Sequence, residues 1–147
     1  MKLNYGQKGR FSYYENKELI VGSGYDTRGG AYFFYKQSQI DIKNELFLGN
    51  RVSKDGGGIY FYKCKNILIE NCMFICNYAK WGGAIYFEQC SDIVLKHNKF
   101  ILNFAYRDGG AISLSCCSGI RILKDNFYLG NIAMRSCKNI EYHNCKV

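Results

Sequence analysis

Short runs of alternating apolar and polar residues recur along the chain, separated by turns rich in glycine or asparagine. Alternation of period two over a few residues predicts β-strands. A glycine pair opens four successive units at spacings of 27, 26 and 27 residues: Gly29-Gly30-Ala31, Gly56-Gly57-Gly58-Ile59, Gly82-Gly83-Ala84-Ile85 and Gly109-Gly110-Ala111-Ile112. An unbroken period of this length predicts stacked supersecondary units.

Each unit continues with the same two features. An alternating apolar pair comes first, at Ile40/Ile42, Ile67/Ile69, Ile93/Leu95 and Ile120/Ile122, and we interpret Ile140/Tyr142 as a fifth pair. Phe-x-x-Asn then closes the unit at Phe47/Asn50, Phe74/Asn77 and Phe100/Asn103. In the last full copy Phe127 is followed by Asn131, one residue late, which predicts a local bulge.

Units of this length with short strands at fixed offsets predict a parallel β-solenoid. Equivalent residues would lie about 4.8 Å apart, one strand spacing per coil. Inward columns would then form continuous Ile, Phe and Ala ladders, and Asn side chains could hydrogen-bond along the stack. The Leu-x-x-Leu-x-Leu frame of leucine-rich repeats is absent, and so is the 3.6-residue periodicity of helical repeats.

The succession of Gly-Gly-Ala-Ile and Phe-x-x-Asn, from about Gly29 to Asn131, is similar to the polymorphic outer-membrane protein repeat. More broadly, it resembles the right-handed parallel β-helix repeats of the pectin-lyase-like superfamily. The resemblance implies an all-β fold, a right-handed parallel β-helix of about five coils with about 27 residues per coil. It also implies two functions found among such proteins, surface adhesion and carbohydrate chemistry.

We expect a single domain over residues 1–147. Residues 1–28 would form a degenerate N-terminal coil or cap, 29–131 the four repeats, and 132–147 a shortened last coil. The shortening is inferred because Cys117 and Cys137 are 20 residues apart instead of 27. A last strand with nothing above it is an unpaired edge, which favours a protein partner or a larger assembly that covers it.

Composition narrows the classes of partner and compartment. The net charge is +8, but no run of Lys or Arg exceeds a pair, so a specific nucleic-acid site is not predicted. No apolar run is long enough for a membrane span, and residues 1–10 lack the apolar core of a signal peptide. Because the sequence shows neither a membrane span nor a signal peptide and its thiols are expected to be unpaired, we predict that the protein is located in the cytoplasm or another intracellular compartment. If the chain is a fragment, a surface location is predicted instead.

Eight cysteines invite a disulfide or metal interpretation. Four of them, Cys64, Cys90, Cys117 and Cys137, fall in one column, for which we favour a buried thiol ladder in a reducing environment. No Cys-x-x-Cys occurs, so neither a metal site nor a cofactor is predicted.

The strands after the glycine pairs carry the candidate binding residues. If Ile59, Phe61, Ile85 and Phe87 point inward, a strip of aromatic side chains points outward: Phe33, Tyr35, Tyr60, Tyr62 and Tyr86. Such a strip could stack on sugar rings or bind a protein surface, and mutual packing of the rings explains it equally well. The strip fades at Ser113 and Ser115. Strand addition at Ile140–Val147, with Ile140 and Tyr142, is the second candidate surface.

Catalysis finds weaker support. Pectin-lyase-like polygalacturonases carry Asn-Thr-Asp, Asp-Asp, Gly-His-Gly and Arg-Ile-Lys motifs, and none of them occurs in this chain. The best acidic column is Asp55 and Asp108, with Trp81 between them and Arg28 below, and two coils separate the aspartates by about 9.6 Å. We therefore predict a non-enzymatic structural or binding module that docks to a protein partner. A carbohydrate-binding or carbohydrate-active protein and a surface-adhesin fragment are the alternatives.

Overall fold

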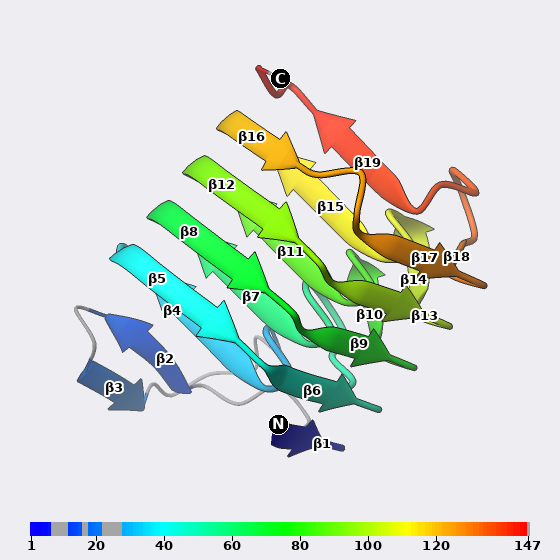
Figure 1. Cartoon of the computed structure of the whole chain (residues 1–147), viewed down its shortest axis with the longest axis horizontal. Coiled ribbons are helices and arrows are strands. Elements are labelled where there is room, and N and C mark those ends of the chain that lie inside the picture. The colour runs from blue at the N-terminus through cyan, green and yellow to red at the C-terminus, as the bar shows by residue number, and fades with distance from the viewer. Residues whose placement is uncertain (7–11, 16–17, 22–27, 147) are drawn as a thin grey trace.

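The chain forms a β-solenoid of about four turns, in which parallel strands from successive coils stack into four sheets (Figure 1). The structure, a computed structural model, describes residues 1–6, 12–15, 18–21 and 28–146, with the backbone alone at 12–15 and 18–21. The described residues contain only strands, turns and bends. The predicted all-β parallel β-helix is therefore confirmed.

The strands that follow the glycine pairs make the largest sheet, with seven strands in the order β19-β15-β11-β7-β4-β2-β3. Its members are β4 (Tyr32–Tyr35), β7 (Ile59–Tyr62), β11 (Ile85–Glu88), β15 (Ile112–Ser115), β19 (Ile140–His143) and the N-terminal hairpin β2 (Ser12–Glu15) and β3 (Glu18–Val21). Strand β2 pairs parallel to β4, and β3 runs antiparallel to β2.

Three smaller sheets complete each coil. A four-stranded sheet contains β5 (Ser38–Lys43), β8 (Lys65–Glu70), β12 (Ser91–Lys96) and β16 (Ser118–Ile122). A five-stranded sheet contains β1 (Lys2–Tyr5), β6 (Glu45–Leu48), β9 (Met73–Ile75), β13 (Lys99–Ile101) and β17 (Phe127–Leu129). A three-stranded sheet contains β10 (Tyr78–Trp81), β14 (Phe104–Asp108) and β18 (Ile132–Ala133).

The glycine pairs allow the coils to approach closely where the fourth side of one coil turns into the first strand of the next. Gly82 has a φ of +62°, in the left-handed region that favours glycine. A Cβ on Gly83 would lie 2.2 Å from the carbonyl oxygen of Gly110 in the next coil. The predicted role of the pair, a tight turn with close backbone approach, is confirmed.

Aromatic and branched ladders fill the interior, as predicted. The rings of Phe47, Phe74 and Phe100 stack with centroids 4.6 and 4.9 Å apart, and Phe61 stacks on Phe87 at 4.8 Å. The paired columns of Ile and Leu side chains on the four-stranded sheet lie beside them, buried from Ile40 to Ile120. This spacing equals the strand repeat, so each ring makes the same contact in every coil.

Asparagine side chains connect the coils where β6, β9, β13 and β17 end. Asn77 donates from Nδ2 to the carbonyl of Phe47 and to Oδ1 of Asn103, each at 2.9 Å. Its own Oδ1 accepts from the backbone N–H and the Nδ2 of Asn50. Asn131 continues the ladder above Asn103. The side chains thereby satisfy main-chain groups that the turn leaves without strand partners.

Cysteine thiols make an equivalent ladder after the strands of the seven-stranded sheet. The backbone N–H of Cys64 donates to Sγ of Cys90, and that of Cys90 donates to Sγ of Cys117, both at 3.4 Å. Each thiol donates in turn to a carbonyl of the coil below, for example Cys90 to Phe61 at 3.5 Å. The free thiol both donates and accepts, so it can fill a role that asparagine fills elsewhere.

The predicted alignment of the last coil is wrong. Ile140 and Tyr142 pair with Ile112 and Leu114 in the seven-stranded sheet, rather than continuing Ile120/Ile122. Cys145, and not Cys137, is the next member of the thiol ladder, since Cys117 N–H donates to its Sγ at 3.4 Å. The distance along the chain is then 28 residues, so the turn before this strand is not shortened. Cys137 is exposed in the turn that precedes β19.

The bulge predicted after Phe127 is also misplaced. Tyr128, and not Phe127, pairs with Phe100 and stacks on it at 5.2 Å, which keeps the three-residue spacing to Asn131. The extra residue lies in the turn between β16 and β17, at Lys124 and Asp125. Phe127 therefore faces outward, and 49% of its surface is exposed. The predicted cap at residues 1–28 lies partly outside the described residues; within them, β1 stacks below β6.

Candidate binding surfaces

The predicted aromatic strip lies on the outer face of the seven-stranded sheet, in two columns that run along the solenoid axis. The first column is Phe33, Tyr60, Tyr86, Ser113 and Glu141, and the second is Tyr35, Tyr62, Glu88, Ser115 and His143. The structure thus brings all five predicted aromatic residues together. Above the aromatic residues, the first column continues with Ser113 and Glu141 and the second with Glu88, Ser115 and His143.

Tyr60, predicted to be exposed, is buried, with 1% of its surface accessible. Its ring packs edge-on against Phe33 at 4.7 Å and stacks on Tyr86 at 5.4 Å, and the Arg28 guanidinium lies 5.5 Å from its centroid. Its hydroxyl donates to Oε2 of Glu88. Burial and the neighbouring Glu88 carboxylate both raise the pKa of Tyr60.

The remaining aromatic side chains of the strip are half-buried by one another. Tyr35 stacks on Tyr62 at 5.5 Å, and Lys36 and Lys63 lie over these two rings at 5.1 and 5.2 Å. Mutual ring packing, the second interpretation of the strip, thus contributes to the cover of its aromatic side chains.

Two ion pairs that flank a tryptophan border this face at the turn before the glycine pairs. Asp55, Trp81 and Asp108 occupy equivalent positions in successive coils, as their spacing in the sequence predicts. Arg28 donates from Nε to Oδ2 of Asp55 at 3.0 Å at one end. At the other end Arg135 donates from Nε to Oδ1 of Asp108 at 3.1 Å, and its guanidinium lies 5.2 Å from the Trp81 ring centroid.

Burial dominates the ionisation of Asp55. Desolvation raises the pKa of its carboxyl, and the attraction of the Arg28 guanidinium opposes that rise. Asp108 is 2% exposed, and Nε2 of His143 also lies 3.9 Å from its carboxylate. The ring of His143 also meets Trp81 edge-on at 5.5 Å. Each aspartate is thus held by its own arginine, an arrangement typical of a structural ion pair and unlike a pair of carboxylates open to substrate.

An open groove lies on the outer face of the four-stranded sheet and was not foreseen. It encloses about 710 Å³. One wall is a column of residues with left-handed φ, namely Gln39, Asn66, Asp92 and Gly119. The next outward column is Asp41, Leu68, Val94 and Arg121. Amide, carboxylate and guanidinium groups therefore face solvent at strand-spacing intervals above an apolar floor.

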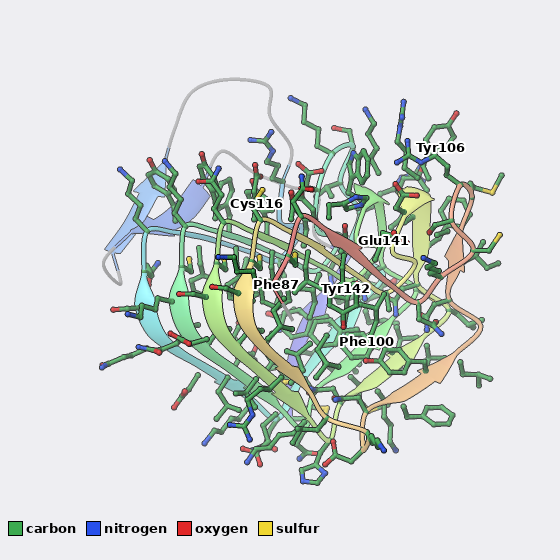
Figure 2. All side chains as sticks on the ribbon, turned by 90° about the horizontal axis from the view of Figure 1, so that it is seen from above. Phe87, Phe100, Tyr106, Cys116, Glu141 and Tyr142 are labelled. Atoms are coloured by element: carbon green, nitrogen blue, oxygen red, sulfur yellow. The ribbon has the colours of Figure 1, made fainter. Side chains whose placement is uncertain are left out.

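A second unforeseen surface is apolar and lies at the C-terminal end of the solenoid. We call it the C-terminal patch; its members are 49–61% exposed and comprise Leu102, Tyr106, Phe127, Leu129, Ile132 and Met134. Tyr106, Phe127, Leu129 and Ile132 lie on β14, β17 and β18, and Leu102 and Met134 directly follow β13 and β18. Tyr106 is labelled in Figure 2. The other large apolar side chains that are exposed among the described ones are Met1, Leu3 and Tyr5 at the other end and Tyr142 on β19.

The C-terminal patch could have been suspected from the sequence. Phe127, Tyr128 and Leu129 form an apolar run with no polar alternate, whereas the equivalent strand β13 has Lys99 outward. The misplaced bulge concealed this signal because it assigned Phe127 to the core.

Ile140 and Tyr142, the remaining predicted site residues, face the interior from the last strand. Tyr142 is nevertheless 40% exposed because no further strand lies above it among the described residues (Figure 2). Strand β19 pairs only with β15, and β17 only with β13 in the described part of the chain. The hydroxyl of Tyr128, on β17, is buried with no hydrogen-bond partner among the described residues.

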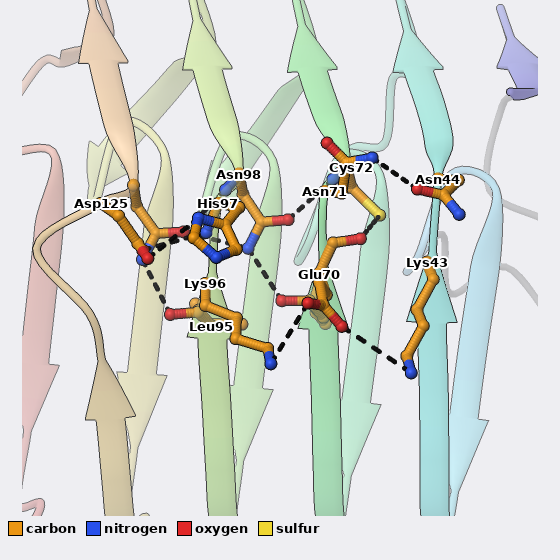
Figure 3. Close-up of polar contacts among 12 residues, drawn as sticks. Lys43, Asn44, Glu70, Asn71, Cys72, Leu95, Lys96, His97, Asn98 and Asp125 are labelled. Atoms are coloured by element: carbon orange, nitrogen blue, oxygen red, sulfur yellow. Dashed lines mark hydrogen bonds and ion pairs between the residues drawn. The ribbon is translucent and has the colours of Figure 1, made fainter.

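Polar contacts also join the coils at the turn between the four- and five-stranded sheets (Figure 3). Glu70 binds Lys96 at 3.2 Å and Lys43 at 3.7 Å, and the nearby Lys96 ammonium lowers the pKa of its carboxyl. Oδ1 of Asn98 accepts from the backbone N–H of Cys72 at 2.9 Å, which makes a second ladder of buried polar side chains. Among the described residues, no group of three or more His, Cys, Asp or Glu side chains is placed to hold a metal ion, and no helix is long and apolar enough to span a membrane.

Comparison with known proteins gives one family. The family model described as "Right handed beta helix region" matches residues 12–147, which is most of the chain. Neither the curated proteins nor the solved structures contain a match. With its stacked parallel strands and its glycine, asparagine and thiol turns, the chain belongs to the right-handed β-helix family.

Proposed function

We propose that this β-helix is a non-enzymatic binding scaffold that docks a protein partner through its C-terminal end. The observation that carries the proposal is the C-terminal patch, next to strands that have no upper neighbour among the described residues. Its six large apolar side chains are exposed, whereas the middle coils bury or half-bury theirs. If each of the six side chains exposes about 100 Å², the patch covers roughly 600 Å². This area is at the upper end of the range for the largest apolar patch on a monomeric protein. It is also close to the area that one partner buries in a protein–protein interface of standard size.

The other predicted surface supports this choice by contrast. Tyr60 is buried, and the rest of the aromatic strip is packed ring on ring, so it offers less accessible apolar area than the patch. Asp55 and Asp108 are each neutralised by an arginine, which supports a scaffold rather than a catalytic role.

Site-specific photo-crosslinking in cells that naturally express the chain tests the proposal. A photoreactive residue at Leu129 or Ile132 should give a discrete protein adduct, identified by mass spectrometry. Lys65, which is exposed on a middle coil, is the matched control position. The proposal would be contradicted if neither patch position gave an adduct, or if the control position Lys65 gave as much adduct as the patch positions.

A second candidate function, carbohydrate binding, is favoured by the groove on the four-stranded sheet. Its volume of about 710 Å³ lies in the range of ligand sites, and its wall presents Asn66 and Asp92 to solvent. A glycan array should then show a bound saccharide class that is lost in Asn66→Ala/Asp92→Ala and retained in Lys65→Ala. No saccharide bound by the wild type, or binding that survives the double substitution, would reject this candidate.

A further inference from the structure

The outer face of the five-stranded sheet is apolar along the whole described length of the solenoid. Two columns of outward side chains form it, and we call it the five-stranded face. The columns are Leu3, Leu46, Met73, Lys99 and Phe127, and Tyr5, Leu48, Ile75, Ile101 and Leu129. All of these residues except Lys99 are apolar, and none of them is buried. The face points sideways from the stack (Figure 1), so a further coil at either end would lengthen it and not cover it.

The strands of this sheet have the sequence pattern of strands that are covered on both faces. β6 contains Leu46-Phe47-Leu48 and β9 contains Met73-Phe74-Ile75, so the inward phenylalanine has an apolar residue on each side. Strands with one face in water commonly alternate apolar and polar residues, whereas strands covered on both faces are apolar throughout. The equivalent outward column of the four-stranded sheet contains the charged residues Asp41 and Arg121. The pattern therefore favours a partner that covers the five-stranded face.

We infer that this partner is a second copy of the chain, and that the two five-stranded faces pack against each other. The outward rows repeat at the strand spacing of about 4.8 Å, so the rows of one face fit between the rows of a surface with the same repeat. A second copy presents that repeat along its whole described length. The inference goes beyond the proposed function, because the five-stranded face shares only Phe127 and Leu129 with the C-terminal patch.

The area of the face suits a stable dimer. Leu3, Tyr5, Phe127 and Leu129 are 49–65% exposed, and the apolar residues between them are partly exposed. If the first group exposes about 100 Å² per side chain and the second about 50 Å², the face offers roughly 650 Å² of apolar surface. Each partner in an interface of standard size buries about 800 Å², so the rim of the face needs to add little.

Lys99 determines how the two copies are oriented. If both solenoids ran in the same direction, each strand would face its equivalent and the two Lys99 ammonium groups would meet in an apolar interface, which is unfavourable. Reversal about a two-fold axis parallel to β9 places β13 against β6 instead. Lys99 then faces Leu46. Ile101 faces Leu48, and Ile75 faces its own equivalent on the axis. The interface is then isologous, as a two-fold dimer requires.

The net charge distinguishes a second copy from other partners. Each chain carries a charge of +8, which opposes the dimer. Repulsion between exposed charges extends over about 8 Å at physiological ionic strength, and added salt shortens that distance. Salt should therefore strengthen a dimer that apolar contacts hold together. It should weaken attachment of the same face to an anionic membrane or to an acidic protein.

Sedimentation velocity of the purified full chain tests the inference. We expect a monomer–dimer equilibrium whose dissociation constant falls several-fold when sodium chloride is raised above its physiological concentration. Ile75→Glu/Ile101→Glu should weaken the dimer at least tenfold. The matched control, Leu68→Glu/Val94→Glu, makes the same kind of change on the outer face of the four-stranded sheet and should leave the dimer unchanged. Circular dichroism during urea unfolding shows whether both variants retain the fold.

Cross-linking tests the reversed orientation without a destabilising charge. Chains with Leu48→Cys are mixed with chains with Ile101→Cys, and in both the exposed thiols are removed by Cys76→Ser, Cys116→Ser and Cys137→Ser. A short bismaleimide should join unlike chains more than like chains, because Leu48 of one copy faces Ile101 of the other.

The outcomes are decisive for the inference and separate from the proposed function. A chain that stays monomeric at high protein and salt concentration, or a dimer that resists Ile75→Glu/Ile101→Glu, would overturn the inference. Cross-links mainly between like chains would overturn the reversed arrangement. Binding to phosphatidylserine vesicles by a chain that forms no dimer would identify a membrane as the occupant and also overturn the inference. Photo-crosslinking at Ile132, which lies outside this face on β18, tests the proposed function independently.

Discussion

Replacing Asn77 by alanine should test whether the asparagine ladder stabilises the stack. Asn77 is 1% exposed, and its side chain takes part in four hydrogen bonds of 2.9–3.0 Å with Phe47, Asn50 and Asn103. Each such bond contributes about 0.5–1.5 kcal/mol net, so the four sum to roughly 2–6 kcal/mol. A middle value of about 4 kcal/mol is a large share of the 5–15 kcal/mol that typically separates folded from unfolded states.

Urea unfolding followed by circular dichroism measures this loss. With a slope of about 2 kcal/mol per molar urea, the midpoint should fall by about 2 M. The matched control is Asn131→Ala, the same substitution at the top of the same ladder. Asn131 also has four side-chain hydrogen bonds, but it is only partly buried, so water can replace them. We expect a loss of about 1–2 kcal/mol for Asn131→Ala. Equal losses in the two variants, or a loss below about 1 kcal/mol in Asn77→Ala, would refute the reasoning.

Three further predictions concern the turns and thiols. Gly83→Ala should lower the free energy of unfolding by several kcal/mol in the same urea assay, because the Cβ of the alanine would lie 2.2 Å from the carbonyl oxygen of Gly110. A small effect would show that the coils can move apart. Iodoacetamide should label the exposed thiols of the native chain rapidly, namely Cys76, Cys116 and Cys137. It should label the buried thiols only when the chain unfolds, namely Cys64, Cys72, Cys90 and Cys117, and mass spectrometry distinguishes the two groups. Early labelling of Cys90 would contradict the buried ladder. Burial raises the pKa of Cys72 from 9.0 to about 11, so the unfolded chain loses this proton first and stability should fall between pH 9 and pH 11. Cys72→Ala should show a shallower decline over this interval, and parallel pH profiles would refute the assignment.

Stability in acid should depend on Asp55 in the opposite sense to an ordinary ion-paired carboxylate. Its folded pKa is raised by burial, so the folded state holds the proton more tightly than the unfolded state. The stabilisation is then complete below the unfolded pKa and is lost as the pH rises through the folded pKa. Thermal unfolding of Asp55→Asn between pH 3 and pH 7 should show a smaller decline with rising pH than the wild type. A larger decline would mean that the Arg28 ion pair dominates.

Several features of the fold could be predicted because each coil repeats the same local chemistry. The Gly82-Gly83 pair, the Ile67/Ile69 pair and the Phe74/Asn77 pair each occupy the predicted place. Asp55, Trp81 and Asp108 likewise share a register along the axis. In a solenoid, equal spacing along the sequence becomes adjacency in space, so counting residues substitutes for knowledge of distant contacts.

The errors fall where the spacing is ambiguous. Ile140-x-Tyr142 has the alternation of either sheet, and both Cys137 and Cys145 suit a thiol column. Only stacking on Ile112 and Leu114 distinguishes the two alignments. Phe127 and Tyr128 are both large and aromatic, and the core selects Tyr128 because the turn at Lys124 and Asp125 takes up the extra residue.

The sequence by itself thus determined the repeat, the strand pattern and the residues that face the core. Tertiary structure decided what covers the outward residues. Alternation places Tyr60 outward, but Arg28, Phe33 and Glu88 bury it from other strands and turns. Leu102, Leu129 and Ile132 are separate outward residues in the sequence and become one exposed patch only when the last two coils stack. The physical reason is that local spacing fixes the direction of a side chain, whereas its exposure depends on neighbours contributed by other coils.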